Sequence, residues 1–158
     1  MNSTPQLRPS IPADLEYFFQ FQLDVQGQYL AAFIPEDPAD KQAYMKKYRR
    51  LLEHPQINMQ TILWEGQVVG SISKFETEGA AEITYWLDQA YWGKGIGSAA
   101  LRQFLQFEKL RPLQARIAFD NIGSQRMLEK NGFIQTGTDT GFANARQTDI
   151  VELIYTLS

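Results

Sequence analysis

One glycine-rich segment stands out in the middle of the chain: Tyr91-Trp92-Gly93-Lys94-Gly95-Ile96-Gly97-Ser98. A strand-like pattern ends shortly before it, and apolar residues at helical spacing follow it. Glycine lets a ligand approach the backbone closely, and the first N–H groups of a helix attract an anion. Lys94 adds a positive charge in the same place. The segment therefore predicts a loop that binds phosphate groups.

Three kinds of phosphate-binding loop can be compared with this segment. A P-loop is excluded, because it needs Lys-Ser or Lys-Thr after its last glycine and Lys94 lies inside the run. A dinucleotide fingerprint fits Gly95, Gly97 and Ala100, with Asp120 near the position of a ribose-binding acid. Several residues separate the strand from the glycines, however, and too little chain follows Asp120 for a Rossmann sheet. We expect the third arrangement, a pyrophosphate held by successive loop amides.

The patterns on both sides of the loop predict a single domain, residues 1–158. Helices are expected at 12–23, 38–52, 98–109 and 121–131, and strands near 7, 57–64, 68–75, 81–87, 113–119, 133–138 and 149–157. Asp37 is expected to cap the second helix, and turns are expected at 65–67 and 77–79; residues 27–38 are ambiguous. This order of elements predicts an α/β domain with a mixed sheet, not a doubly wound one.

The composition limits the chemistry. The chain has 158 residues, no cysteine and one histidine, His54, which excludes disulfides, cysteine nucleophiles and multi-histidine metal sites. Fifteen Lys and Arg against eighteen Asp and Glu leave a net charge of −3, which argues against a broad nucleic-acid surface. No apolar run is long enough to span a membrane, and the N-terminal sequence lacks the layout of a signal peptide. We therefore expect a cytoplasmic protein with no metal and no nucleic-acid or membrane partner.

Three segments together resemble one family. Tyr91–Gly97 resembles the acyl-CoA pyrophosphate loop of the GNAT N-acetyltransferase superfamily, and residues 120–133 resemble its second cofactor motif. Leu7-Arg8-Pro9, with Asp14 soon after, resembles its usual opening. The combination is most similar to the branch that contains the ribosomal-protein N-terminal acetyltransferases. The resemblance implies a largely antiparallel twisted sheet, with a central parallel βαβ splay and helices on both faces. It also implies acetyl transfer from acetyl-CoA to a primary amine, by direct attack in a ternary complex.

The resemblance implies two catalytic side chains. Glu82 matches the catalytic glutamate of the histone-acetylating members, which implies a general base for the amine. Asp149 and Glu152, on the last predicted strand, stay open as alternative bases. Ser124 corresponds to a serine proposed to protonate the leaving thiolate, although a serine in the first turn of a helix also bonds nearby backbone. A tyrosine that acts as general acid in other branches would fall at Leu128, so that role is not carried over.

The resemblance also implies how acetyl-CoA is bound. The backbone N–H near Trp86 would stabilise the oxyanion, and backbone groups of Leu87 and Asp88 would pair with the pantetheine arm. Asn121 would contact the cofactor, cap a helix, or do both. The expected phosphate contacts come from the loop residues Trp92, Gly93, Lys94, Gly95, Ile96, Gly97 and Ser98.

Two other classes of protein stay open. One is a CoA-binding regulatory module without catalysis, and the other is a dinucleotide-binding oxidoreductase that uses the fingerprint at Gly95. The acceptor stays open between a protein N-terminus and a small-molecule amine, because the acceptor pocket depends on the first helices and the final hairpin loop. A homodimer also stays open.

Overall fold

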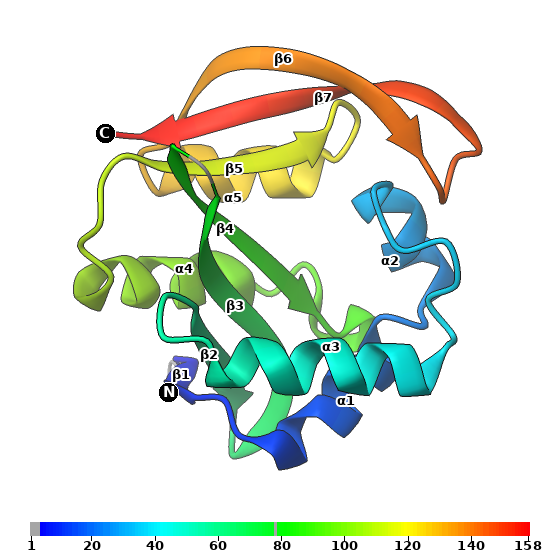
Figure 1. Ribbon diagram of the computed structural model, residues 1–158. Coiled ribbons are helices and arrows are strands. Elements are labelled where there is room, and N and C mark those ends of the chain that lie inside the picture. The colour runs from blue at the N-terminus through cyan, green and yellow to red at the C-terminus, as the bar shows by residue number, and fades with distance from the viewer. Residues whose placement is uncertain (1–3, 78) are drawn as a thin grey trace.

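The computed structural model describes residues 4–77 and 79–158 (Figure 1). Residues 1–3 and Glu78, which belongs to the turn expected at 77–79, lie outside the described residues. The strands are β1 (Gln6–Pro9), β2 (Asn58–Trp64), β3 (Gln67–Thr77), β4 (Ala80–Leu87), β5 (Leu113–Ala118), β6 (Ile134–Ala143) and β7 (Thr148–Leu157). The helices are α1 (Leu15–Phe21), α2 (Val25–Ala31), α3 (Lys41–Glu53), α4 (Ile96–Phe107) and α5 (Ile122–Lys130), with 3-10 turns η1 (Pro12–Asp14) and η2 (Gln89–Tyr91).

The strands of the described residues form one sheet in the order β1-β2-β3-β4-β5-β7-β6. Neighbouring strands in this part of the chain are antiparallel, except for β4 and β5. That parallel pair joins only where Ala81 faces Leu113 and Glu82 faces Gln114. Directly after Glu82 the two strands diverge, which opens the sheet in its middle (Figure 1). The expected fold class, a mixed and largely antiparallel sheet with a parallel βαβ splay, is confirmed.

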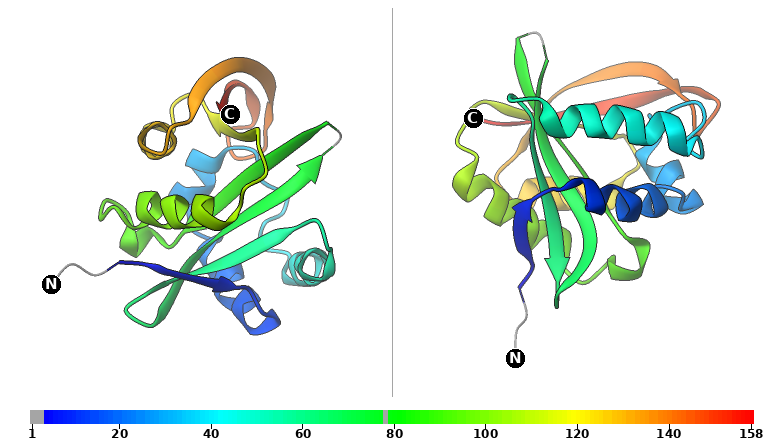
Figure 2. Two further views of the ribbon diagram at one scale, coloured as in Figure 1. Left: turned by 90° about the vertical axis from the view of Figure 1, so that its left-hand side faces the viewer. Right: turned by 60° about the horizontal axis from the view of Figure 1, so that its bottom comes forward.

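Helices cover both faces of this sheet (Figure 2). On one face, α4 buries Leu101 and Phe104, and α5 adds a further buried leucine to the same core. On the other face, Leu15 and Phe18 of α1 pack with Met59 of β2, beside the apolar side of α3. The buried residues of α1 and α4 are spaced so that they lie on one side of each helix. The splayed sheet therefore lies between two layers of helices.

The helix expected to begin at Asp37 begins later. The Asp40 carboxylate accepts a hydrogen bond from the Ala43 N–H at 3.1 Å and therefore takes the capping position of α3. Asp37 lies in the preceding turn. The ambiguous part of the chain forms α2, which Asp24 caps by accepting from the Gly27 N–H at 3.1 Å. The prediction of Asp37 as the cap was wrong, because Asp40 is an equally good capping residue three positions later.

Two hairpins test the strand predictions. The turn expected at 65–67 is confirmed, because Glu65 and Gly66 join β2 to β3 with φ of 51° and 80°. The final hairpin is longer than expected, since β6 continues past Thr138 and pairs with β7 as far as Ala143 and Thr148. The polar, glycine-containing composition of 137–141 suggests a loop, but a continuous antiparallel ladder holds this segment in a strand.

A buried aspartate ties the N-terminal strand to the sheet. Asp14 is 2% exposed and pairs with Arg8 through contacts of 2.7 and 2.8 Å. It also accepts from the Ile11 N–H at 2.9 Å and the Thr61 hydroxyl at 2.7 Å. Burial raises the pKa of Asp14, but these partners outweigh burial and the net pKa is lowered.

Candidate active site

Two adjoining cavities lie at the splay between β4 and β5. The first has a volume of about 620 Å³ and is called the loop cavity, because the glycine loop forms part of its wall. The second has a volume of about 480 Å³ and is called the aromatic cavity, after the rings that α1 and α3 supply. Residues that line both cavities are Leu30, Ala31, Tyr85, Trp86, Asn121 and Ser124. The two cavities therefore share a boundary.

The backbone of the glycine loop is open toward the loop cavity. Gly93 and Gly95 have φ of 76° and 77°, a left-handed conformation that favours glycine. A Cβ at either position would meet no atom within 4 Å. Gly95 is also the N-cap of α4, so the unpaired N–H groups of a 12-residue helix lie beside the cavity. This geometry suits an anionic ligand.

The seven loop residues predicted to bind the cofactor divide into two groups. The cavity is lined by Trp92, Gly93, Gly95, Gly97 and Ser98. Ile96 is 1% exposed and packs in the core, where it anchors the loop. Lys94 lies outside the cavity wall, with Nζ 5.8 Å from the centroid of the Tyr91 ring. Trp92 donates from Nε1 to the Leu87 carbonyl at 2.8 Å and so ties the loop to the end of β4.

The first turn of α5 supplies another part of the wall. The Asn121 Oδ1 accepts from the Ser124 N–H at 3.3 Å, and its Nδ2 donates to the Leu30 carbonyl at 3.4 Å. Asn121 is therefore a helix cap, and its contact with a cofactor stays a prediction. For Arg126 and Lys130 the sequence favours a solvated helix face over contact with cofactor phosphates; both are exposed and also line the loop cavity. They bring two positive charges to it.

Two amides of β4 face β3. The Asp88 N–H donates to the Val69 carbonyl at 2.8 Å, and the Asp88 carboxylate accepts from a backbone N–H of η2. A Cβ on Gly70 would collide with the Trp86 carbonyl, which therefore also points toward β3. The structure contradicts the expected backbone roles of Trp86 and Asp88 toward the cofactor, because the Trp86 backbone faces β3 and the Asp88 carbonyl accepts from the Tyr91 N–H at 2.9 Å.

The alternate amides of β4 face the gap. In an antiparallel pair, successive residues direct their N–H and C=O groups to opposite sides of the strand. Because residues 86 and 88 face β3, Tyr85 and Leu87 face the side from which β5 has diverged. The Leu87 carbonyl accepts from the Trp92 side chain, so the N–H groups of residues 85 and 87 are the donors on this edge. The Trp86 side chain still lines both cavities.

Three carboxylates converge on Arg116 of β5. Its Nε lies 3.3 Å from Glu82 Oε1, and its Nη1 lies 2.7 Å from Glu152 Oε1 and 3.3 Å from Asp139 Oδ2. Arg116 and Glu152 line the aromatic cavity. Glu82 lines neither cavity, but it contacts Arg116. Burial raises the pKa of Glu82, the charge of Arg116 lowers it, and Glu152 raises it again, which leaves a raised pKa.

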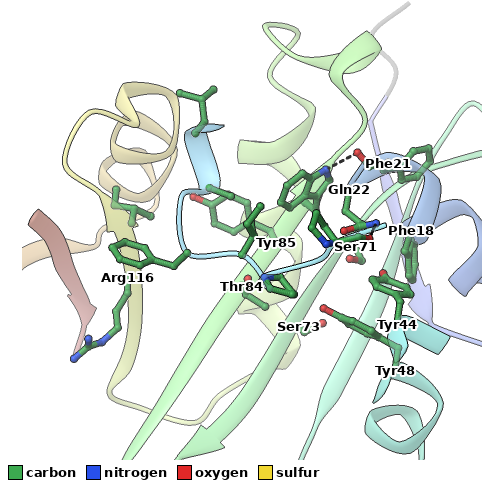
Figure 3. A pocket seen from close by; sticks show the side chains of 18 of the residues that line it. Phe18, Phe21, Gln22, Tyr44, Tyr48, Ser71, Ser73, Thr84, Tyr85 and Arg116 are labelled. Carbon is green, nitrogen blue, oxygen red and sulfur yellow. Dashed lines mark hydrogen bonds between the residues drawn. The ribbon is translucent and has the colours of Figure 1, made fainter. Parts of the chain in front are cut away.

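Neutral polar side chains form one part of the wall of the aromatic cavity. Tyr44 and Tyr48 of α3 lie across the cavity from Arg116 (Figure 3), and their rings stack with centroids 4.2 Å apart. Burial raises the pKa of both hydroxyls, so the two side chains stay protonated at neutral pH. Ser71 and Ser73 of β3 face the same space. The spacing of these tyrosines resembles that of ordinary core residues, so the sequence gives no signal for this role.

Tyr85 lies at the boundary of the two cavities and was not predicted as a site residue. Its hydroxyl is buried with no hydrogen-bond partner among the described residues. Burial raises the pKa of Tyr85 to about 12, and the nearby Ser124 side chain lowers it by a smaller amount. Strand alternation places Tyr85 on the inner face of β4, but alternation cannot show that Tyr85 lines a cavity.

A clasp joins the final hairpin to α2. Arg146 pairs with Asp120 through contacts of 2.8 and 2.9 Å and donates from Nε to the Tyr29 carbonyl at 2.8 Å. Its guanidinium also lies 3.7 Å from the centroid of the Tyr29 ring. The carboxylate that a dinucleotide site would direct at a ribose is therefore paired within the protein. Together with the largely antiparallel sheet, this pairing argues against the oxidoreductase alternative.

No group of three or more His, Asp or Glu side chains that could hold a metal ion occurs in residues 4–77 and 79–158. In the same part of the chain, no helix is long and apolar enough to cross a membrane.

A sheet that splays between two parallel strands, with a glycine loop and a helix N-terminus at the opening, defines a GNAT-type acetyltransferase fold. The sequence agrees. The family model described as acetyltransferase (GNAT) domain matches residues 6–134, and the chain belongs to this family. The resemblance seen in the loop and in the segment 120–133 is thereby confirmed.

Two curated bacterial relatives match parts of the chain. YjcK of Bacillus subtilis, named a probable N-acetyltransferase, is 36% identical over 81 residues, which is 46% of this chain and 45% of YjcK. The ribosomal-protein-serine acetyltransferase of Escherichia coli is 36% identical over 83 residues, 48% of this chain and 46% of that protein. The chain thus spans about half the length of the curated relatives it matches.

Solved structures share the fold over nearly the whole chain. RimL, a ribosomal alpha-N-protein acetyltransferase in complex with coenzyme A, has a TM-score of 0.84 at 20% identity and covers 99% of this chain and 94% of its own. RimJ of Mycobacterium smegmatis, in complex with CoA-disulfide, has a TM-score of 0.79 at 22% identity, with 97% of this chain and 81% of its own covered. At these identities the likeness establishes the fold.

Proposed function

We propose that this protein transfers the acetyl group of acetyl-CoA to a primary amine, by direct attack in a ternary complex. The observation that carries the proposal is the shared boundary of the two cavities. Tyr85, Trp86, Asn121 and Ser124 line both, so a thioester in one cavity would meet an amine in the other. Such proximity removes much of the entropic barrier to a two-substrate reaction.

The loop cavity is the proposed site of acetyl-CoA. Its pyrophosphate would lie on the open amides of Gly93 and Gly95 and the N-terminus of α4. Arg126 and Lys130 would add positive charge. The pantetheine arm would run along β4 in the gap left by β5, where the Leu87 N–H faces it. These contacts need no metal, and the local positive charge offsets the acidic character of the whole chain.

The acceptor must lose a proton before it attacks. At neutral pH, removing the proton of an alkyl ammonium costs about 4–5 kcal/mol. Glu82 is the proposed base, acting through water, because its raised pKa makes it a better proton acceptor than an ordinary carboxylate. Its place at the start of the splay supports the role. Glu152 is the second candidate, because it lines the aromatic cavity itself.

The tetrahedral intermediate needs a donor for its oxyanion. The N–H group of Tyr85 also faces the gap and is the proposed donor, in place of the Trp86 N–H. Loss of such a donor typically costs about 3 kcal/mol of transition-state stabilisation. Ser124 lines both cavities and would lie beside the leaving sulfur.

The proposed acceptor is the N-terminal amine of a peptide or protein, in a cytoplasmic location. Asp37, Asp40 and Glu152 line the aromatic cavity against the two cations Lys47 and Arg116, and this excess of one carboxylate would favour a cation. The hydroxyls of Tyr44 and Tyr48 could hydrogen-bond peptide amides. The relatives named after ribosomal-protein acetylation support the same choice.

A direct test uses purified protein and a panel of acceptors. Peptides with free or blocked N-termini, a polyamine and free amino acids are each mixed with acetyl-CoA, and thiol release is followed with mass spectrometry of the acceptor. We expect acetylation of peptides with a free N-terminus and none of the blocked peptides. Binding of CoA without acetylation of any acceptor would favour the regulatory module, and thermal stabilisation by NAD(P) without stabilisation by CoA would favour the oxidoreductase.

A further inference from the structure

One buried hydroxyl has no explanation in the packing of the protein. Among residues 4–77 and 79–158, Tyr85 Oη is the buried side-chain oxygen without a hydrogen-bond partner. Buried polar groups are almost always paired, because an unpaired one loses its hydrogen bonds to water and gains nothing in exchange. A Phe at this position would keep the ring contacts of Tyr85 with the core. A ligand that reaches this hydroxyl would supply its missing hydrogen-bond partner.

The position of Tyr85 limits which part of a ligand it can reach. It lines both cavities, as does Ser124. In Figure 3, Tyr85 lies between Arg116 on one side and the aromatic residues on the other. A thioester attacked from one cavity while bound in the other must place its carbonyl carbon and sulfur at this boundary.

We infer that the Tyr85 hydroxyl donates a hydrogen bond to the sulfur of acetyl-CoA as the thiolate leaves. The inference rests on the proposed function. In the reaction, the amine nitrogen forms a bond to the thioester carbon, the C–S bond breaks, and its electron pair goes to sulfur. The amine proton leaves through the base, and the CoA thiolate later takes a proton from solvent. Tyr85 keeps its own proton throughout.

The chemistry favours a hydrogen-bond donor over an acid. The pKa of Tyr85 is raised by burial to about 12, whereas a thiol has a pKa of about 8.5. Full proton transfer from this phenol to a thiolate would therefore be uphill by several pK units. A phenol that stays protonated is still a good donor to a developing negative charge in a site with little water. The position differs from Leu128, where other branches carry their tyrosine.

The test measures the ionisation of bound CoA and needs no acceptor. The thiolate of CoA absorbs in the ultraviolet, so the thiol pKa of CoA bound to the protein can be titrated. We expect a thiol pKa below that of free CoA in the wild type, and a value about one unit higher in Tyr85→Phe, since a hydrogen bond to a charge is lost. Desulfo-CoA, which lacks the sulfur, is expected to bind both proteins equally.

A matched control separates this effect from the loss of any buried tyrosine hydroxyl. Tyr155 is 2% exposed, donates to Glu129 at 3.3 Å and lines neither cavity. Tyr155→Phe is expected to leave the thiol pKa of bound CoA unchanged. An equal thiol pKa in the wild type and Tyr85→Phe, both with CoA bound, would overturn the inference and leave the proposed function standing. Failure of the wild type to bind CoA would overturn the proposed function itself.

Stability supplies an independent readout. Because the Tyr85 hydroxyl is buried without a partner, Tyr85→Phe is expected to have an unchanged or higher Tm. Its kcat is expected to fall about tenfold or more, with little change in the KM for acetyl-CoA. A lower Tm with unchanged kcat would assign Tyr85 a packing role and overturn the inference.

Discussion

Nε of Arg116 lies 3.3 Å from Oε1 of Glu82, at the residue where β4 and β5 separate. The same guanidinium lies 2.7 Å from Glu152, so one cation connects the two candidate bases. If Glu82 is the base, Glu82→Gln lowers kcat about 100-fold or more, the usual worth of a general base, while the Kd for CoA stays unchanged. Steady-state kinetics and calorimetry measure both quantities. Glu152→Gln is the matched variant, and loss of the acidic limb of the pH–rate profile in that variant alone would transfer the role to Glu152.

The positive charge of Arg116 affects the pKa of Glu82, and the pH dependence of the rate should therefore depend on Arg116. The base must be ionised to act, so activity falls as pH drops through the pKa of Glu82. Arg116 lowers this pKa against the raising effect of burial. Arg116→Met therefore raises the pKa of Glu82, and the acidic limb of the pH–rate profile moves to higher pH. An unshifted limb in a folded Arg116→Met protein would contradict the assignment of Glu82.

Much of this site follows from local chemistry that a sequence displays. The glycine loop, the capping Asn121 and the strand that carries Glu82 were predicted, because each depends on spacing or on residues adjacent in the chain. Arg116 gave no signal, because its partners come from β4, β6 and β7 and meet only when the sheet forms. Tyr85 gave no signal either, because its position in the site depends on the gap that opens where β5 diverges from β4. Of the backbone groups expected to face the cofactor, Leu87 faces the gap but Trp86 and Asp88 do not, because their direction depends on the register with β3.

Gly95 and Gly66, two glycines with similar positive φ, allow a paired experiment on the loop. Gly95 and Gly66 have φ of 77° and 80°, and a Cβ would meet nothing within 4 Å at either position. Alanine at each site should cost about 1 kcal/mol of folding free energy through backbone strain. Because Gly95 lines the loop cavity and Gly66 lies in the β2–β3 turn, only Gly95→Ala should raise the Kd for CoA. Equal CoA affinity in both variants would place the pyrophosphate elsewhere.

The buried Asp14 predicts a specific loss of stability. Asp14→Asn removes the charge that pairs with Arg8 and should lower the free energy of unfolding by roughly 2–4 kcal/mol. The net pKa of Asp14 is lowered by folding, so its contribution is present above the unfolded pKa of about 3.9 and is lost as pH falls through the folded value. Denaturant unfolding at pH 7 and below pH 4 should show a gap between the two proteins that narrows in acid. A constant gap would mean that the charge is not responsible.

The clasp between Arg146 and Asp120 should affect binding of the acceptor, because it holds α2 beside both cavities. Arg146→Lys loses the bidentate pair and the stacking on Tyr29. Since α2 contributes Leu30 and Ala31 to both cavities, a loosened α2 should raise the KM for the acceptor several-fold. The Tm should fall by a few degrees. A normal acceptor KM despite a lower Tm would limit the clasp to a structural role.

Acetyl transfer at the boundary of the two cavities is tested most directly by following the acetyl group. Acetyl-CoA with an isotopically labelled acetyl group is mixed with the protein and a peptide that has a free N-terminus, and mass spectrometry locates the label over time. We predict one labelled acetyl group on the peptide amine, formed only when both substrates are present, and no label on the protein. Label that stays on CoA with every peptide, or that appears on the protein first, would contradict direct transfer.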